Sequence, residues 1–386
     1  MKKGILVLIL ILASLGLCSC GNTGNDINDD DLYKNEYREN IEEKTISNLE
    51  EKRIREDKVQ KFEAVLKDGR YWKAMGIDNT CKILGHTDRY NGKSEEIILY
   101  NFSDETYETI YTLEENWSVG EAKITDKYIV WNEYLSTEGA LSSYKTRLLD
   151  RSTKEISIID ENHEGISNLS IGEAEIYWAT NHKTDKGVSR CIMKYDINNK
   201  EKALYMDLAT SPALGEGFLA WLEAEEGSSE YNILCIQNLE TKEITKLTSE
   251  KSPNFLIAKG DSIIFSGYDE EIKVQEGSNK KYSICLYKNN TITKIKAAED
   301  DKFEYPQFNG DYVSWRGTDE LRIFSLRDEK IYLLPQEKKS DSDILMCNKY
   351  ILWSSPINVG ELAKQDAIDH GMYKSYINIL NVDNLK

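Results

Sequence analysis

The chain alternates short apolar runs with polar turns, and six of the runs end on an aromatic side chain. Glycines or charged residues frame each run, as in "DKYIVWNE" at 126–133 and "GDYVSWRG" at 310–317. Intervals of 38 to 50 residues separate the six aromatic positions, which are Trp131, Trp178, Trp221, Phe265, Trp315 and Trp353. A repeat of about 44 residues is typical of one four-stranded blade of a β-propeller.

Each unit also contains a second alternating run, followed by a polar turn and a return strand, as in "ILCIQNLETKEITKL" and "LRIFSLRDEKIYLL". Alternation with a period of two around such turns predicts β-hairpins, and the units show no long helical periodicity. We therefore predict an all-β fold, a seven-bladed β-propeller of four-stranded antiparallel blades, with six blades as the alternative. The aromatic residue at the end of the second strand is expected to pack between neighbouring blades.

The two ends of the repeat array are irregular. The last hairpin, "YINILNVDNLK", stops where its return strand should begin, and the first unit has "CKILGHT" where the others have an aromatic residue. An open ring would leave unpaired strand edges, so another segment has to complete the last blade. We expect that segment between residues 59 and 77, as either "VQKFEAVL" or "RYWKAMGI".

The N-terminus has the pattern of an export signal. Lys2 and Lys3 precede an uncharged stretch at 4–17, which is too short for a lasting transmembrane helix. Residues 17–20, Leu-Cys-Ser-Cys, resemble the lipobox of bacterial lipoproteins. That resemblance implies a signal peptide at 1–19, lipid attachment at Cys20, and a membrane-anchored protein that faces the extracytoplasmic side. An ordinary signal peptide with incidental cysteines is the alternative.

The segment after Cys20 divides into two parts. Residues 20–31 are polar and predict a flexible tether. Residues 32–58 are highly charged, and Tyr33, Tyr37 and Ile41 fall four apart, which predicts a helical stalk. We expect this stalk to share no core with the propeller domain at 59–386, although it could bind a partner.

The composition limits the partners. The net charge is −18 with 30% charged residues, which argues against nucleic acid as a ligand. Five cysteines lie beyond the leader, widely spaced and without a CxxC pair, and three of them fall in predicted strands. We interpret them as buried reduced thiols rather than as a disulfide framework or a zinc site.

Parts of the repeat resemble a known group. The stretch "ITKLTSEKSPNFLIAKGDSIIFSGYDE", followed by "YSICLYKNNTITKI", resembles the TolB-like and WD40-like propeller repeats of bacterial envelope proteins. The resemblance covers roughly residues 70 to 386 and implies the fold alone. The "SPDG" turn and the WD dipeptide of those families are absent.

No catalytic signature appears in the chain. HExxH, GxSxG and P-loop motifs are missing, and the four histidines are scattered. The long segments after the aromatic residues of the fifth and seventh units are the best candidates for a binding face. The residues proposed there are Tyr268, Asp269, Glu270, Glu361, Asp366 and His370. We expect a non-catalytic binding or scaffold module for a protein or glycan partner, with no cofactor and no metal. The alternative is a hydrolase acting on envelope or extracellular glycans or peptides.

Overall fold

The computed structural model describes most of the chain beyond residue 34. The described residues are 35–37, 42–47, 49–137, 140–162, 166–184, 187–224, 231–247, 255–274, 277–295, 304–317, 320–335 and 344–385. All of them belong to one compact unit, Asn35–Lys386. The predicted signal peptide, Cys20 and the tether lie outside the described residues.

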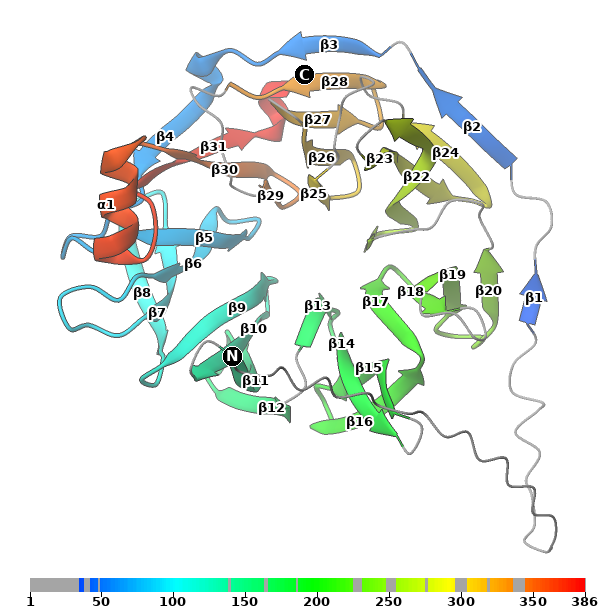
Figure 1. Cartoon of the computed structure of the whole chain (residues 1–386), viewed down its shortest axis with the longest axis horizontal. Coiled ribbons are helices and arrows are strands. Elements are labelled where there is room, and N and C mark those ends of the chain that lie inside the picture. Colours follow the sequence, from blue (N-terminus) through cyan, green and yellow to red (C-terminus); the bar gives the residue numbers. More distant parts are fainter. Residues whose placement is uncertain are drawn as a thin grey trace, which may run out of the picture. The chain divides into compact units, whose positions relative to one another are not determined.

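The described residues form seven separate sheets, which follow one another around a ring (Figure 1). The first three blades each consist of four consecutive antiparallel strands, because each strand turns back through a short polar connection. Blade 1 contains β5 (Trp72–Ile77), β6 (Lys82–Thr87), β7 (Glu96–Asn101) and β8 (Thr106–Thr112). Blade 2 contains β9 (Trp117–Ile124), β10 (Tyr128–Thr137), β11 (Ala140–Asp150) and β12 (Ile156–Asn162). Blade 3 contains β13 (Ile166–Ile171), β14 (Glu175–Thr184), β15 (Gly187–Asp196) and β16 (Glu201–Asp207).

The next three blades repeat this arrangement. Blade 4 contains β17 (Ala209–Leu214), β18 (Phe218–Ala224), β19 (Tyr231–Asn238) and β20 (Ile244–Leu247). Blade 5 contains β21 (Leu256–Lys259), β22 (Ser262–Val274), β23 (Gly277–Lys288) and β24 (Thr291–Ile295). Blade 6 contains β25 (Glu304–Phe308), β26 (Tyr312–Arg316), β27 (Leu321–Ser325) and β28 (Lys330–Leu333). The prediction of a seven-bladed propeller with four-stranded antiparallel blades is confirmed.

Blade 7 is built from both ends of the propeller sequence. It contains β29 (Leu345–Met346), β30 (Tyr350–Pro356) and β31 (Ser375–Asn381), and its fourth strand is β4 (Val59–Glu63). A short 3-10 turn, η3 (Val382–Leu385), follows β31. Because β4 pairs antiparallel with β31, it closes the ring, and "VQKFE" is confirmed as the closing strand. The other candidate, "RYWKAMGI", contains the first strand of blade 1.

The repeated aromatic residues form the core between blades. Each lies on the second strand of its blade, and the side chains of Trp131, Trp178, Trp221, Phe265, Trp315 and Trp353 are at most 2% exposed. Cys191, Cys235 and Cys285 are also buried, each on the third strand of its blade. The sequence therefore predicted both the packing role of the aromatic residues and the burial of these three thiols.

Blade 1 replaces the missing aromatic residue from a different strand. Gly85 occupies the place on β6 that Trp131 occupies on β10. A Cβ atom at Gly85 would stand 2.7 Å from the indole of Trp72, which comes from β5 and is 1% exposed. The glycine thus leaves room for an indole that the neighbouring strand supplies.

The helical stalk predicted at 32–58 is wrong for the described residues of that range, which form strands and a single 3-10 turn, η2 (Glu56–Lys58). Strands β1 (Asn35–Tyr37), β2 (Glu42–Ile46) and β3 (Glu50–Arg53) each add a parallel fifth strand to the outer edge of blades 4, 5 and 6. Together with β4 we call them the belt, which runs along the outside of the ring in Figure 1. Pairing with the blade edges stabilises these residues as strands more than the weak helical pattern stabilises a helix. Without the added strands, these blade edges would expose unpaired N–H and C=O groups.

The belt also contributes to the core, contrary to the expectation of an independent stalk. Ile54 is buried beside Trp353 and Leu380, and Ile46 and Leu49 pack on the cluster between blades 5 and 6. Phe62 of β4 stacks on Tyr100 with ring centroids 5.2 Å apart. The belt is therefore part of the propeller.

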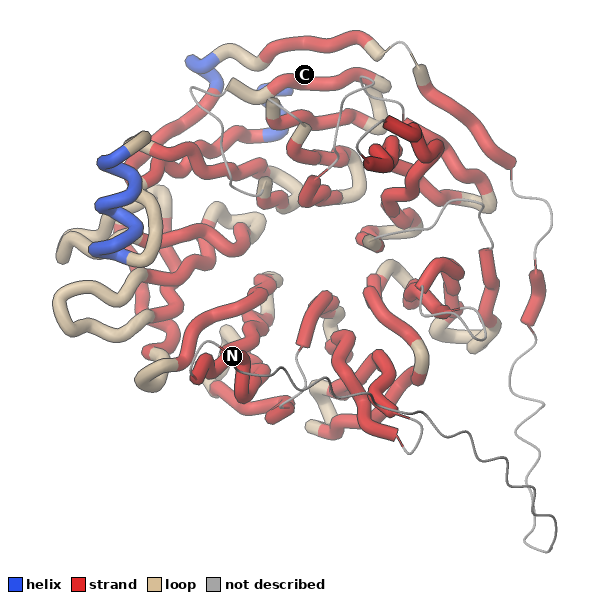
Figure 2. Tube along the Cα trace, viewed as in Figure 1, coloured by secondary structure: helices blue, strands red, loops and turns tan. Residues whose placement is uncertain are grey.

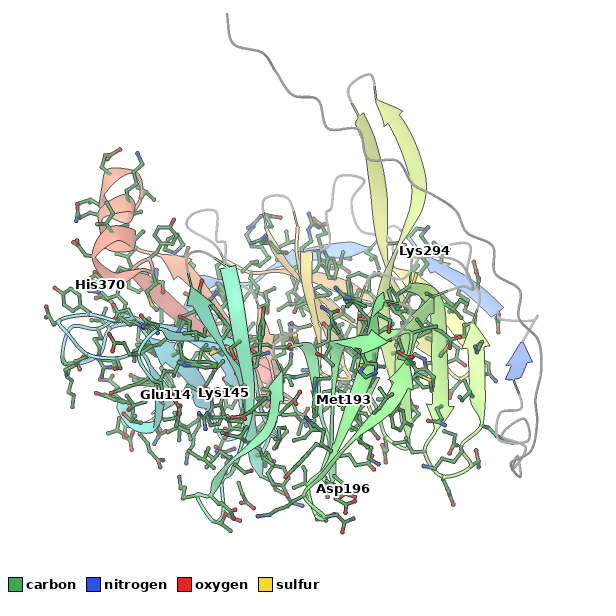
Figure 3. All side chains as sticks on the ribbon, turned by 60° about the horizontal axis from the view of Figure 1, so that its bottom comes forward. Glu114, Lys145, Met193, Asp196, Lys294 and His370 are labelled. Carbon is green, nitrogen blue, oxygen red and sulfur yellow. The ribbon has the colours of Figure 1, made fainter. Side chains whose placement is uncertain are left out.

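Strands dominate the described residues, as Figure 2 shows. Blade 7 also contains an α-helix, α1 (Glu361–His370), which is inserted between β30 and β31. No helix of the described residues is long and apolar enough to span a membrane. In Figure 3, α1 and the long β22–β23 hairpin rise from the same side of the ring but on separate blades.

Candidate functional site

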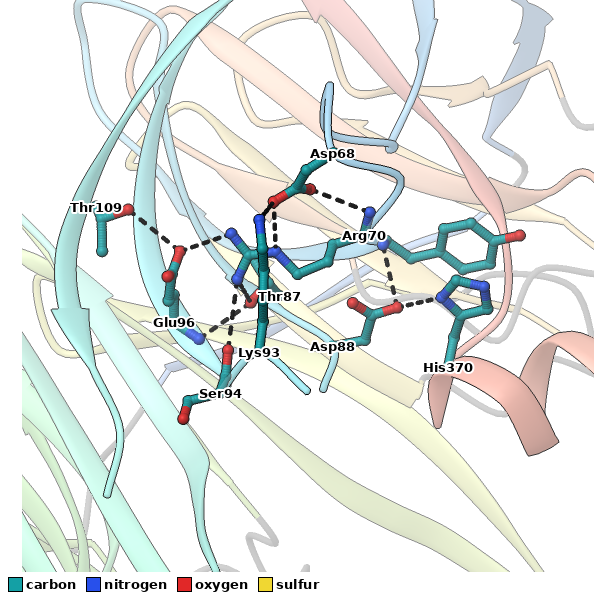
Figure 4. A network of polar contacts seen from close by, with 10 residues as sticks. Asp68, Arg70, Thr87, Asp88, Lys93, Ser94, Glu96, Thr109 and His370 are labelled. Atoms are coloured by element: carbon teal, nitrogen blue, oxygen red, sulfur yellow. Dashed lines mark hydrogen bonds and ion pairs between the residues drawn. The ribbon is translucent and has the colours of Figure 1, made fainter. Parts of the chain in front are cut away.

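The connection between β6 and β7 concentrates polar side chains at the junction of blades 1, 2 and 7. Residues 86–96 read "HTDRYNGKSEE". A buried ion-pair network holds this connection in place: the Arg70 guanidinium, 4% exposed, pairs with Asp68 at 3.0 Å and with Glu96 at 2.9 Å (Figure 4). Burial opposes the charge on Arg70, but the two carboxylates outweigh it and raise the pKa of Arg70. The Arg70 guanidinium also donates to Oγ1 of Thr87 at 3.3 Å, so the connection is fixed at both of its ends.

His86 and Glu95 form a hydrogen-bonded pair within this connection. The Oε1 atom of Glu95 accepts hydrogen bonds from Nδ1 of His86, at 3.0 Å, and from the backbone N–H of Val119 in blade 2, at 3.1 Å. Because a carboxylate accepts, the neutral imidazole carries its proton on Nδ1, which leaves the Nε2 lone pair to act as a base. Arg89 lies 3.8 Å from the other oxygen of Glu95 and adds a positive charge to the cluster.

His86 lines a cavity of about 400 Å³. Its walls come mainly from the first strands of blades 1 and 2, with contributions from blades 6 and 7. The polar and charged side chains along it are Lys73, His86, Glu121, Lys123 and Gln307. A cavity of this size has room for a small ligand or for one or two units of a chain.

The lysines of the cavity differ in their partners. Lys73 stands directly opposite His86 in the register of β5 and β6, so both side chains leave the sheet on the same face. No carboxylate among the described residues pairs with Lys73, whereas Lys123 lies 3.3 Å from Glu121. The cavity therefore offers an oriented imidazole beside an ammonium group.

A second histidine cluster joins α1 to blade 1. His370, 10% exposed, lies between the rings of Tyr71 and Tyr90, with centroids 3.8 and 4.0 Å away, and its Nδ1 atom contacts Oδ2 of Asp88. The same Asp88 oxygen accepts the N–H of Tyr71, while its other oxygen, Oδ1, is buried without a partner among the described residues. Burial raises the pKa of Asp88 despite these contacts. The cluster attaches α1 to blade 1, which also lines the cavity.

Three predicted site residues lie on this helix. Asp366 accepts a hydrogen bond from the Tyr71 hydroxyl at 3.2 Å, and burial together with Asp366 raises the pKa of Tyr71 to about 12. His370 joins the aromatic cluster described above. Glu361 begins α1 and pairs with Lys364 at 2.7 Å. The long segment of the seventh unit thus contains a helix, and Asp366 and His370 contact residues of blade 1. The part of these three residues in a binding face stays a prediction.

The other three predicted residues lie on blade 5. Tyr268, Asp269 and Glu270 belong to β22, where Tyr268 pairs with Tyr282 and Glu270 with Lys281. The predicted loop is a two-stranded extension of the blade. The side chains of these three residues lie outside the description, so their part in a binding face stays a prediction.

Sequence reasoning missed His86, Glu95 and Lys73. The sequence shows His86 only as one of four scattered histidines. Its contact with Glu95 could not be predicted, because Glu95 is nine residues away and is held by Val119 of the next blade. The available signal was the density of charged residues in 86–96 in the one unit that lacks the aromatic residue.

No protein-family model and no characterised protein matches the sequence. Several solved structures share the fold at low identity. An oligogalacturonate lyase in complex with manganese aligns with a TM-score of 0.54 and 10% identity, covering 85% of this chain and 98% of the lyase. The propeller domain of the trilobed protease from Pyrococcus furiosus, described as having an open velcro topology, has a TM-score of 0.54 and 12% identity, covering 74% of this chain and 89% of that domain. An acylaminoacyl peptidase from Pyrococcus horikoshii aligns with a TM-score of 0.53 and 11% identity, covering 74% of this chain and 49% of the peptidase.

The comparisons confirm the β-propeller part of the family resemblance. They do not test the lipoprotein part, which stays a prediction. The expected non-catalytic binding or scaffold role is contradicted, because these structural neighbours are a lyase and peptidases.

The manganese of the lyase has no counterpart in the residues described for this chain. They contain no group of three or more His, Cys, Asp or Glu side chains placed to hold a metal ion. At the cavity, Nδ1 of His86 is already engaged by Glu95. The described donor set does not fit such a metal.

Proposed function

We propose that the protein is an extracytoplasmic enzyme that cleaves chains of acidic sugars by elimination, with His86 as the base. The observation that carries this proposal is the His86–Glu95 pair at the wall of the cavity, beside Lys73. Elimination from a uronate needs a base for the proton next to the carboxylate and a cation to stabilise the charge that develops there. The cavity supplies both.

The steps balance without a cofactor. Nε2 of His86 takes the proton from the carbon that bears the carboxylate. The electron pair left behind forms a carbon–carbon double bond, and the neighbouring bond to the departing sugar oxygen breaks. That oxygen takes up a proton from solvent, and His86 later returns its own proton to solvent. Glu95 holds the imidazole in the required tautomer, and Lys73 pairs with the substrate carboxylate.

The share of each neighbour that aligns with this chain differs between the lyase and the peptidases. This chain spans 98% of the oligogalacturonate lyase but about half of the acylaminoacyl and prolyl peptidases. The match with the peptidases therefore leaves half of each of those proteins without a counterpart in this chain. The low identity carries the fold alone, so the choice of substrate class rests on the cavity residues.

The test is a direct assay for the unsaturated product. We expect the purified protein, incubated with oligogalacturonate and with alginate, to generate the ultraviolet absorbance of a conjugated double bond on at least one of them. Neutral galactan is the control, because without a carboxylate the proton is not acidic enough to remove. Release of reducing ends from galactan without this absorbance would contradict the proposal.

The cellular location is part of the proposal. The lipobox-like residues 17–20 support lipid attachment at Cys20 and a membrane-anchored position on the extracytoplasmic side, where polymeric substrates are accessible. Cys20→Ala is expected to move the protein from the membrane pellet to the soluble fraction, since the acyl chains supply about 0.8 kcal/mol per buried CH₂. Retention of the variant in the pellet after a carbonate wash would refute lipid anchoring.

A further inference from the structure

Two cysteines lie at the junction where the ring closes. Cys81 belongs to the turn between β5 and β6 of blade 1, and Cys347 to the turn between β29 and β30 of blade 7. Both are half-buried, whereas the three cysteines on third strands are buried in three different blades. These two are thus the most accessible thiols of the described residues, on turns that face each other.

One backbone carbonyl brings the two turns together. The carbonyl oxygen of Asp78 accepts the N–H of Cys81 at 3.1 Å and the thiol of Cys347 at 3.4 Å. The next residue, Asn348, donates its N–H to the side chain of Asn79 at 3.1 Å. Both thiols also pack against the same apolar cluster, which includes Tyr350. The two turns therefore lie against each other, with both cysteines in one cluster, although the residues are far apart in sequence.

Hydrogen bonds fix the turn that carries Cys81. Oδ1 of Asp78 accepts the N–H of Thr80 at 2.9 Å and that of Lys82 at 3.0 Å, and Oδ2 accepts from Arg151 of blade 2 at 2.8 Å. Burial opposes the charge on Asp78, but these donors outweigh it and lower the pKa of Asp78. The turn holds Cys81 at a φ of 63°, a conformation that a cysteine adopts only when its surroundings impose it.

The turn that carries Cys347 is fixed as well. The N–H of Cys347 donates to the carbonyl of Tyr350 at 3.0 Å, and its own carbonyl accepts from Asn309 of blade 6 at 2.9 Å. Two hydrogen-bonded turns thus hold the two cysteines at one junction, and a disulfide forms there if their Cα atoms come within about 7 Å.

We propose that Cys81 and Cys347 are a modification site, oxidised to a disulfide that links blade 1 to blade 7. The two thiols lose two protons and two electrons as the sulfur–sulfur bond forms. The electrons pass through a mixed disulfide to the disulfide of an exported thiol oxidase, which is reduced to its dithiol. The proposal rests on the export proposed above, because such an oxidant acts outside the cytoplasm.

Burial raises the pKa of both thiols, that of Cys81 to about 11. Few thiolates are therefore present at neutral pH, so the reaction needs the oxidase.

The disulfide would stabilise the wall of the cavity. Met346 lines the cavity directly before Cys347, and Ile77 lines it from the strand that leads to Cys81. The closing strand β4 joins the two ends of the chain by non-covalent contacts alone. A covalent link at the cavity wall keeps blades 1 and 7 together even when β4 frays.

The test compares the full chain after exposure to a purified thiol oxidase and after reduction. We expect non-reducing peptide mapping of the oxidised protein to give one cross-linked peptide pair, containing Cys81 and Cys347, with a mass lower by two hydrogens. The melting temperature should rise by about 5–10 °C on oxidation, since the bond closes a long loop of the unfolded chain.

Cys347→Ser and Cys81→Ser, each made alone, are the matched controls. Each should fold in its reduced form and show no oxidant-dependent rise. Alkylation of both thiols in the oxidised wild type, or a cross-link that joins other cysteines, would overturn the proposal. Sugar-chain cleavage is not measured here, so failure of the proposed enzyme activity would leave this outcome unchanged.

Discussion

His86→Asn is expected to lower kcat for uronate-chain cleavage by about 10²- to 10⁴-fold, the usual contribution of a positioned base. Asparagine is close in size and can still donate a hydrogen bond to Glu95, so the pair's packing is retained while the basic lone pair is lost. The measurement is the rate of unsaturated product formation at saturating substrate, together with the melting temperature of each protein.

His182→Asn is the matched control, because His182 is exposed on β14 of blade 3, away from the cavity-lining residues. It should retain the wild-type rate. Glu95→Gln tests the positioning role and should reduce kcat while leaving KM nearly unchanged. An unaltered rate in His86→Asn would exclude this histidine as the base.

Removal of the belt is expected to have the largest effect on stability. A chain that starts at residue 35 keeps the belt and should have a melting temperature within about 2 °C of that of the full chain. A chain that starts at residue 55 loses the three edge strands β1 to β3, so its melting temperature should be about 5–10 °C below that of the full chain. A chain that starts at 65 also loses β4 and should show no cooperative unfolding, since blade 7 is then left open. Thermal unfolding followed by circular dichroism measures all three.

A point substitution separates the core contact of β4 from its backbone pairing. Phe62→Ala removes a ring that lies 5.2 Å from both Tyr100 and Phe102 and should cost about 2–4 kcal/mol in the free energy of unfolding. Gln60→Ala, at an exposed position of the same strand, should change it by less than about 0.5 kcal/mol. Equal melting temperatures for the chains starting at 35 and at 65 would show that β4 does not close the ring.

The blade pattern could be predicted because each second strand places an aromatic residue in the same packing environment. Trp131 and Trp353 are both fully buried for this reason. The exception in blade 1 could not be predicted from the period, because Trp72 reaches the equivalent space from another strand and Gly85 only makes room for it.

The belt escaped prediction for a different reason. Glu50–Arg53 is exposed at every position, so it has no alternation of apolar and polar residues that would indicate a strand. Its strand conformation is determined by pairing with β28, a contact across more than 270 residues of sequence. Local pattern contains no information about such a partner.

The candidate site was also beyond local pattern. His86 acquires its orientation from Glu95, and Glu95 in turn is held by the backbone of Val119 in the next blade. Segment length singled out the insertion in blade 7, where His370 and Asp366 contact blade 1 and attach α1 to it. A binding role for this insertion stays a prediction. Which polar residues meet at a propeller junction is decided by the ring, not by spacing along the chain.

The central claim, cleavage by elimination in the cavity of blades 1 and 2, is tested most directly by mass spectrometry of the products formed in heavy-oxygen water. Elimination adds no water at the cut, so the masses of the two products should together equal that of the substrate. The unsaturated product should be lighter, by the elements of water, than the saturated product that hydrolysis would give. Products whose masses together equal that of the substrate plus one heavy-oxygen water for every bond cut would identify a hydrolase and contradict the account.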